Sequence, residues 1–282
     1  MKTILYATDC NPKSSAALRY AENLTATLDT RLLVLYVYDV PPIMGRIIKS
    51  KEQVGRSLKD EKTEFMTNYC EQHFSGKINT TKVHYIAEYH TSISEAILNK
   101  TKEFDVDMLL IGMKDVHTQR GIFSGNIANK ILEKVACHLL IVPNNIANNE
   151  LRTIVYATDF EEDDIEAISQ VLPIAIAFDA TIKIIHIDTR DNKKGNEQMA
   201  WFKEMVSQTV TYTPITFTIV EADSISEGLR RFIGNENADA IALLERTEQN
   251  ILKKLFHKDT IKTIESQIKI PLLVINQKVI NQ

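Results

Sequence analysis

Two glycines that bracket one loop, Gly112 and Gly125, are the residues whose type and spacing most clearly could do chemistry. Gly112 follows a short apolar run at residues 108–111, and Gly125 precedes a helix-like segment at residues 126–135. Glycine lets a backbone approach an anion closely, and the free N–H groups of a helix N-terminus supply donors and the positive end of a dipole. The pattern predicts that a phosphate or another anion would bind in this loop, although both glycines are equally consistent with simple turns.

Other signatures of chemistry are absent from the sequence. It contains no GxxxxGK[ST] P-loop, no GxSxG nucleophile elbow and no HExxH zinc-binding helix, and no GxGxxG follows the first strand. The three cysteines, Cys10, Cys70 and Cys137, are scattered without metal-ligand spacing or a disulfide pattern. We therefore predict no metal site, no catalytic residue and a reducing cytoplasm. Cys10 lies near a strand end, where it is either a reactive thiol or a plain small residue.

The elements that must position the glycine loop alternate between strand and helix. Strand patterns occur at residues 2–8, 31–37, 80–87, 108–111 and 139–142. Helical patterns separate them, including a long charged helix expected over residues 51–74 and a helix opened by the SISE capping box at residues 92–95. This βαβαβαβαβ order predicts a parallel sheet with helices on both faces. Ligands bind such sheets beyond the carboxyl ends of the strands at the topological switch point, and Asp9, Val37 and Gly112 fall at such ends.

The same pattern occurs twice along the chain. KTILYATDC at residues 2–10 matches RTIVYATDF at residues 152–160. SISE recurs at residues 224–227, and CHLLIVP at residues 137–143 is echoed by IPLLVIN at residues 270–276. Three matches in the same order predict a tandem repeat of one α/β unit, with a first domain at residues 1–147 and a second at residues 148–282.

Only the first copy has the glycines. Leu244 stands where the first copy has Gly112, and the loop at residues 245–259 contains no glycine. Close backbone approach to a phosphate is harder without glycine, and Glu245 and Glu248 would repel an anion. We therefore predict a degenerate second loop, although its lysines leave phosphate binding open. The side chains expected to fill this loop are Leu252, Leu255 and Phe256.

Length and composition limit the classes of protein to which the chain can belong. The chain has 282 residues, of which 44% are hydrophobic and 25% are charged, as expected for a globular protein of two ordinary domains. Its net charge of −4 offers no basic footprint for nucleic acid and no polybasic face for lipid. No apolar run approaches the roughly 20 residues of a membrane-spanning helix, and the short run at the start is interpreted as a strand rather than a signal peptide. We predict no nucleic-acid partner and no membrane.

The residues quoted above carry a resemblance to a known family. TILYATDC with SSAALRYA after it, LLVLYVYD, and IG-x(12)-GNIANKILEKVACHLLIVP resemble the universal stress protein family. The resemblance covers both halves, so the chain looks like a tandem two-domain member. It implies an α/β fold with two tandem five-stranded parallel sheets of the adenine nucleotide α-hydrolase-like type. It also implies internal pairing of the domains through residues 139–142 and 272–275, with a homodimer left open.

ATP-binding members of this family carry G-x2-G-x9-G-[ST] after the fourth strand. Gly112 and Gly125 match the first and third glycines, whereas Asp115 replaces the second and Asn126 replaces the final Ser or Thr. Asp115 would place a negative charge near phosphate oxygens, which Lys114 or Arg120 could offset, and Asn126 can still donate through its amide. The resemblance implies a nucleotide site that consists of Ala7, Thr8, Asp9, Val37, Ile111, Gly112, Lys114, Gly125, Asn126 and Ile127.

Together, the residues and the resemblance predict a cytoplasmic stress-response protein. It would bind ATP with Mg²⁺, or AMP, in its first domain. Its second domain would form an internal pseudo-dimer with the first. The protein would have at most weak ATPase activity. The alternative is a ligand-free scaffold that acts through protein partners. Two local alternatives also stay open: Asp9 either binds polar ligand groups or caps the next helix, and His117 either touches phosphate or is simply exposed. The acidic run at residues 161–164 is interpreted as a complement to a helix dipole.

Overall fold

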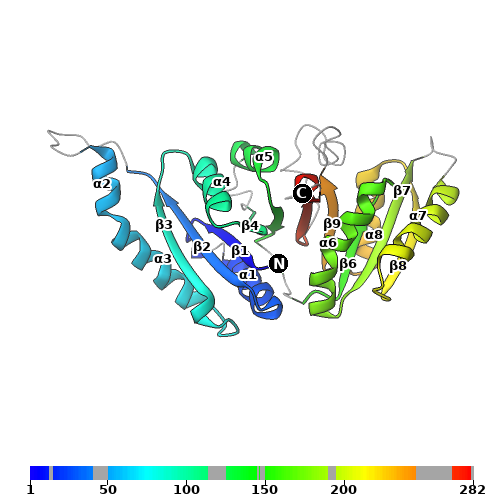
Figure 1. Ribbon diagram of the computed structural model, residues 1–282, viewed down its shortest axis with the longest axis horizontal. Coiled ribbons are helices and arrows are strands. Elements are labelled where there is room, and N and C mark those ends of the chain that lie inside the picture. The colour runs from blue at the N-terminus through cyan, green and yellow to red at the C-terminus, as the bar shows by residue number, and fades with distance from the viewer. Residues whose placement is uncertain are drawn as a thin grey trace. The chain divides into compact units, whose positions relative to one another are not determined.

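The computed structural model (Figure 1) describes residues 1–12, 15–40, 50–113, 125–144, 146, 150–189, 195–245 and 269–280. These residues form two compact units. The first consists of Met1–Cys137 and Ile141–Asn145, and the second consists of His138–Leu140 and Ile146–Gln282. Strands and helices alternate along both units, as the sequence pattern predicts.

The first unit is built around four strands and the end of a fifth, β5, whose residues 138–140 fall in the second unit. Its elements are β1 (Thr3–Thr8), α1 (Ser15–Leu28), β2 (Arg31–Tyr38), α2 (Lys51–Ser57), α3 (Lys59–His73), the 3₁₀ turn η2 (Thr80–Lys82), β3 (Val83–Tyr89), α4 (Ile93–Glu103), β4 (Met108–Gly112), α5 (Gly125–Lys134) and β5 (His138–Val142). The strand order is β3-β2-β1-β4-β5, and β1 pairs in parallel with both β2 and β4. Helices α1 and α3 pack together, as do α4 and α5, on opposite sides of the strands (Figure 1). The order of the strands reverses between β1 and β4, which makes this the topological switch point.

The second unit repeats this plan. Its elements are β6 (Thr153–Ala157), α6 (Glu162–Phe178), β7 (Thr181–Thr189), α7 (Gly195–Thr209), β8 (Ile215–Ala222), α8 (Ile225–Asn235), β9 (Ala240–Glu245), β10 (Leu272–Asn276) and α11 (Gln277–Ile280). The strand order is β10-β9-β6-β7-β8, and the pairs on either side of β6 are parallel. The α/β class and the parallel strands predicted from the sequence are confirmed.

Unusual backbone conformations recur at matching places in the two units. Within the described residues, six residues other than glycine have a positive φ, and they fall into three pairs that occupy equivalent positions of the repeat. The pairs are Cys10 and Phe160 (φ 54° and 62°), Asp29 and Asp179 (53° and 50°), and Asp105 and Asn237 (47° each). Asp and Asn tolerate the left-handed conformation, but Cys and Phe adopt it less readily. The turn after the first strand of each unit is therefore held by its surroundings.

In each unit, an aspartate at the equivalent position of the repeat fixes the start of the first strand. The Asp107 carboxylate accepts hydrogen bonds from the backbone N–H groups of Lys2 and Thr3, each at 2.7 Å. The Asp239 carboxylate accepts two equivalent bonds in the second unit, at 2.8 and 2.9 Å. Each aspartate directly precedes the strand that pairs with the first strand, so it also sets the register of that pair.

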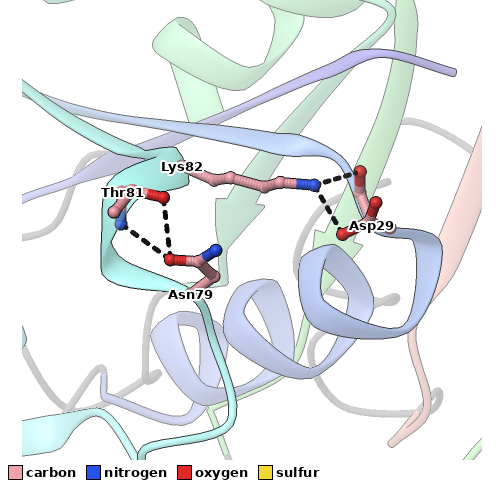
Figure 2. A network of polar contacts seen from close by, with 4 residues as sticks. All are labelled: Asp29, Asn79, Thr81 and Lys82. Carbon is pink, nitrogen blue, oxygen red and sulfur yellow. Dashed lines mark hydrogen bonds and ion pairs between the residues drawn. The ribbon is translucent and has the colours of Figure 1, made fainter.

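The two units close the end of their first helix differently. In the first unit, the Lys82 ammonium donates to the backbone carbonyl of Asp29 at 3.1 Å and to its carboxylate at 2.5 Å, next to the turn that Asn79 caps (Figure 2). A cation at this place satisfies free carbonyls and the negative end of the helix dipole. In the second unit, the Tyr212 hydroxyl donates to the carbonyl of Ala180 at 2.6 Å. The repeat thus conserves the position of this cap but not its chemistry.

Two expectations about the first unit need correction. The charged stretch at residues 51–74 forms two helices, α2 and α3, that meet at Leu58. The Tyr38 hydroxyl donates to the Gly55 carbonyl at 2.8 Å, and the ring of Tyr89 packs directly against Gly55, so the last turn of α2 is anchored to the sheet. The third strand begins at Val83 and extends to Tyr89, because residues 80–82 form the 3₁₀ turn.

Candidate functional site

Three neighbouring strands of the first unit bring most of the predicted site residues to one edge. In the parallel register, Ala7 of β1 lies beside Ile111 of β4, and Thr8 lies beside Tyr36 of β2, which precedes Val37. Gly112 ends β4 next to this edge. The side chains of Ala7, Thr8, Val37 and Ile111 are buried, so mainly backbone and the residues after each strand would be available to a ligand at this edge. This edge is the switch point, where open α/β sheets bind ligands.

The turn after β1 presents a carboxyl group at this edge. The Thr8 hydroxyl accepts the Cys10 N–H at 2.9 Å, and the Asp9 carboxylate accepts the Asn11 N–H at 3.1 Å. Desolvation by burial raises the pKa of Asp9 above its ordinary value of 3.8, although the Asn11 N–H acts in the opposite direction. A carboxylate held in a place that disfavours its charge is characteristic of functional sites.

Gly112 leaves the end of β4 bare. A Cβ atom at this position would lie 3.1 Å from the Ala17 Cβ of α1 and 3.6 Å from the Asn144 Oδ1. The glycine therefore has a packing role, because it lets α1 approach the strand closely. Next to it, the Met113 N–H donates to the Val142 carbonyl at 2.8 Å and ties the start of the following loop to β5.

Asn144 adds a polar group that the sequence did not reveal. It follows Pro143 at the end of β5. Its Oδ1 is buried and has no hydrogen-bond partner among the residues that the structure describes. A buried acceptor without a donor is costly, so the group calls for an explanation.

The rest of the predicted site lies on α5 and in the loop before it. Gly125 is the first residue of α5, and Ile127, two residues later, is half-buried. Asn126 belongs to the same first turn, where N–H groups are free to meet an anion. Lys114, Asp115, His117 and Arg120 lie outside the described residues, so their predicted roles stay predictions.

The corresponding edge of the second unit is filled. Leu244, fully buried, occupies the position of Gly112. Gln277, which matches Asn144 in the repeat, donates its side-chain amide to the Asp163 carboxylate at 2.5 Å. The bare Gly112 of the first unit thus corresponds to the apolar Leu244, and the unpartnered Asn144 Oδ1 corresponds to a Gln277 side chain that forms a hydrogen bond. The loop residues expected to fill this site, Leu252, Leu255 and Phe256, lie outside the described residues, as does the loop's lysine cluster.

A carboxylate of the second unit occupies the N-terminus of its own first helix. Asp164 is buried and accepts hydrogen bonds from the Tyr156 hydroxyl at 2.9 Å and from the Thr158 hydroxyl at 2.8 Å. The backbone N–H groups of Asp159 and Glu161 also point at it, at 3.3 and 3.4 Å. The acidic run was interpreted from the sequence as a complement to the helix dipole, but its fourth member is a buried hub of hydrogen bonds. An external anion would find this position already negative.

Aromatic rings fill the space beside this carboxylate. The Phe160 ring stacks on the His186 ring with centroids 4.2 Å apart and contacts the Phe202 ring at 5.6 Å. The His186 Nδ1 lies 2.9 Å from the Thr158 carbonyl. In the first unit, the matching positions hold Cys10 and Tyr36, whose side chains build no such stack.

Comparison with known proteins decides the family. A model of the universal stress protein family matches residues 1–143. The chain belongs to the universal stress protein family. A universal stress protein from Archaeoglobus fulgidus matches 98% of this chain and 98% of its own at 14% identity, with a TM-score of 0.68. A protein of unknown function from Pseudomonas aeruginosa covers 100% of this chain and 95% of its own at 13% identity, with a TM-score of 0.64. Both matches show the fold.

Another solved structure that is similar to part of this chain contains a nucleotide. A universal stress protein in complex with cAMP covers 45% of this chain and 98% of its own at 15% identity, with a TM-score of 0.37. The nucleotide is a property of that protein. No curated protein matches the sequence at a significant level.

The three cysteines of this universal stress protein are buried free thiols. Burial raises the pKa of Cys10 to about 12 and that of Cys137 to about 12, and it also raises the pKa of Cys70. Because the thiolate is the reactive form, Cys10 is a small buried residue rather than a nucleophile.

The described residues hold neither a candidate metal cluster nor a helix suited to cross a membrane. They contain no group of three or more His, Cys, Asp and Glu side chains that could hold a metal ion. None of the helices in this part of the chain has the length and hydropathy that a membrane crossing requires.

Proposed function

We propose that this universal stress protein is a cytoplasmic stress-response regulator that binds one adenine nucleotide, ATP or AMP, in its first unit and none in its second. Asp9 and the backbone of Val37 would hold the adenosine part. Gly112 and the first turn of α5, with Gly125 and Asn126, would hold the phosphates. Nucleotide occupancy rather than turnover would carry the signal, because the sequence contains no catalytic signature.

The contrast between the two copies of one edge carries this proposal. In the first unit the edge ends in bare glycine, a half-buried carboxyl with a raised pKa and an unpartnered acceptor. In the second unit the same edge is closed by Leu244, by the Gln277–Asp163 bond and by the Asp164 carboxylate. A fold that had no use for the first edge would gain stability by closing it in the same way.

Isothermal titration calorimetry on the full chain tests the proposal. The ligands are ATP with and without Mg²⁺, AMP, and cAMP, which is bound in one matched structure. We expect one nucleotide per chain and loss of binding in Gly112→Leu, which copies the residue of the second unit. Asp9→Asn removes the charge but keeps an acceptor for the Asn11 N–H, and we expect it to weaken binding about ten- to a hundredfold, the effect of losing a charged hydrogen bond.

Asp159→Asn is the matched control, because it makes the same substitution at the same place in the second copy. It should bind nucleotide like the wild type. Thermal unfolding followed by circular dichroism checks that each variant is folded, since the Gly112 site is tight. Two nucleotides per chain would refute the closed second unit. No heat with any nucleotide would refute the proposal and favour the ligand-free scaffold.

A further inference from the structure

The outermost strand of the second unit has one side that is available for pairing. β8 pairs with β7 along its whole length, and no described strand lies on its other side (Figure 1). The Ile182 N–H donates to the Pro214 carbonyl at 2.8 Å, so the even-numbered residues of β8 direct their backbone groups towards β7. The odd-numbered residues of the strand therefore direct their backbone groups outwards.

β8 lacks the features with which proteins usually block a free sheet edge. Residues 215–220, ITFTIV, include no charged residue, no glycine and no proline, and their pairing with β7 runs without a bulge. None of these residues is buried. β3, the outermost strand of the first unit, is better covered, because Val83 and Ala87 are buried. An uncovered apolar edge without such protection is suited to pair with another strand.

Only some of the outward backbone groups of β8 have partners within the unit. The Ile215 N–H donates to the Thr213 carbonyl at 2.7 Å, and the Arg231 guanidinium donates to the Glu221 carbonyl. The groups that find no partner among the described residues are the Ile215 carbonyl, the N–H and carbonyl of both Phe217 and Ile219, and the Glu221 N–H.

A second copy of β8, running antiparallel about a two-fold axis at Thr218, matches these groups one to one. Phe217 then faces Ile219 of the second copy, and the two residues exchange both hydrogen bonds. Ile215 faces Glu221 of the second copy, so a free carbonyl meets a free N–H. With the axis at Phe217, the Ile219 carbonyl would instead face the Ile215 N–H, which is already bonded. The axis at Thr218 uses every free group.

The charges beside β8 are complementary in the same arrangement. The Lys203 Nζ of α7 lies over the Phe217 ring, 5.9 Å from its centroid, so the side chains of the odd-numbered residues face α7. Glu221 of the second copy, opposite Ile215, would be a diagonal neighbour of Phe217 on this face. Lys203 and Glu221 are both exposed, and each would therefore meet the other across the contact.

We infer that the protein forms a homodimer through β8, in which the β8 strands of two copies pair antiparallel about Thr218. The partner is a second copy of this chain because both the free backbone groups and the charges of β8 are complementary to themselves. A two-fold contact uses each β8 once, so assembly closes at the dimer. The dimer does not require nucleotide, because the candidate nucleotide site belongs to the first unit.

Sedimentation velocity of the full chain over a series of protein concentrations tests the inference. Wild type should pass from monomer to dimer, and no larger species should form. Ile219→Pro removes one outward N–H, and an edge strand tolerates proline where the N–H faces away from the sheet. We expect this variant to raise the dissociation constant of the dimer about ten- to a hundredfold, because each copy loses one hydrogen bond across the contact.

Charge reversal tests the register of the two strands. Lys203→Glu and Glu221→Lys should each raise the dissociation constant about tenfold, because each brings like charges together on both sides of the axis. The double variant should restore the wild-type dissociation constant, because it exchanges the two charges. Glu204→Lys is the control for Glu221→Lys: it makes the same charge change at an exposed neighbour of Lys203 and should have no effect.

Three outcomes would contradict this dimer. Wild type that stayed monomeric at every concentration would overturn the inference. A dimer that Ile219→Pro left intact would overturn it too, because another surface would then form the contact. A double charge variant that failed to restore the dimer would overturn the pairing about Thr218. Circular dichroism checks that each variant is folded, and the charge variants alter only exposed side chains, so they test the contact even if Ile219→Pro does not fold.

Discussion

Removal of the Asp164 carboxylate should lower the free energy of unfolding of the second unit far more than substitution of any neighbouring acidic residue. Its two short bonds, from the Tyr156 hydroxyl at 2.9 Å and the Thr158 hydroxyl at 2.8 Å, are buried. A hydrogen bond to a charged group contributes about 1.5–3 kcal/mol, so Asp164→Ala should lower the free energy of unfolding by about 3–6 kcal/mol. The two backbone bonds are longer than 3.2 Å and add little.

The sole tryptophan of the chain makes this measurable. Trp201 lies on α7 beside Phe202, and the Phe202 ring contacts Phe160, which follows Thr158 and Asp159 in the turn that Asp164 holds. Tryptophan fluorescence during urea unfolding therefore reports on the second unit. With an m-value of about 2 kcal/mol per molar urea, the expected loss moves the midpoint by about 1.5–3 M.

Glu162→Ala is the control for the loss of a negative charge in the first turn of α6. Glu162 is exposed, so its interaction with the helix dipole contributes at most about 1 kcal/mol. If Asp164→Ala shifted the midpoint no further than Glu162→Ala does, Asp164 would be only another first-turn acid. The argument that the second unit fills its anion position with its own carboxylate would then fail.

Three further predictions concern stability and reactivity. The three cysteines should not react with a disulfide reagent at pH 8 until the protein is unfolded, because burial raises their pKa values. Asp9→Asn should be more stable than wild type at pH 7, and the difference in melting temperature should shrink as the pH falls towards 3.8, the ordinary pKa of Asp9. Gly228→Ala should lower the free energy of unfolding by about 1–3 kcal/mol in urea titrations, the usual effect of overpacking. Its new Cβ would lie 2.7 Å from the Ile187 Cγ2.

The sign of the Asp9 prediction follows from the direction of its pKa shift. Burial raises the pKa of the folded carboxyl, so the folded state holds its proton more tightly than the unfolded state does. Below the ordinary pKa both states are neutral at this residue, and no stability is lost. As the pH rises through the raised pKa, the wild type must bury a charge, which Asp9→Asn never carries. A difference that stayed constant between pH 4 and pH 7 would contradict this reasoning.

Controls for the other two predictions lie in the same chain. Gly234 shares helix α8 with Gly228, but nothing lies within 4 Å of its would-be Cβ. Gly234→Ala should therefore stabilise the protein by about 0.5–1 kcal/mol through helix propensity alone, and a loss there would contradict the packing argument for Gly228. For the cysteines, titration in denaturant should recover all three thiols. Rapid reaction of any thiol in the folded protein would contradict this argument, and mass spectrometry of the labelled protein would show whether that thiol is Cys10.

The repeat, the strands and the helix starts could be predicted from the sequence because short-range physics specifies them. Apolar runs bounded by Asp or Gly form strands buried on both faces, and the Ser92 and Ser224 side chains cap their helices from three residues away. The edge that holds the candidate site followed from strand order, since the carboxyl ends of parallel strands share one edge. The break at Leu58 did not follow from the sequence pattern, and the contacts that hold the preceding helix at Gly55 come from Tyr38 and Tyr89, which lie far from it along the chain.

The amino-acid sequence alone thus specifies that one α/β unit occurs twice and that only the first copy has glycines at its switch point. It does not say which of four consecutive acids turns inward. Asp164 becomes a buried hub only because the folded turn aims the hydroxyls of Tyr156 and Thr158 at it. Nor does it say that the Asn144 Oδ1 has no hydrogen-bond partner among the described residues, because a hydrogen bond requires a partner within about 3.5 Å and only folding fixes those distances. Open and closed edges differ through such directional contacts, which periodicity cannot encode.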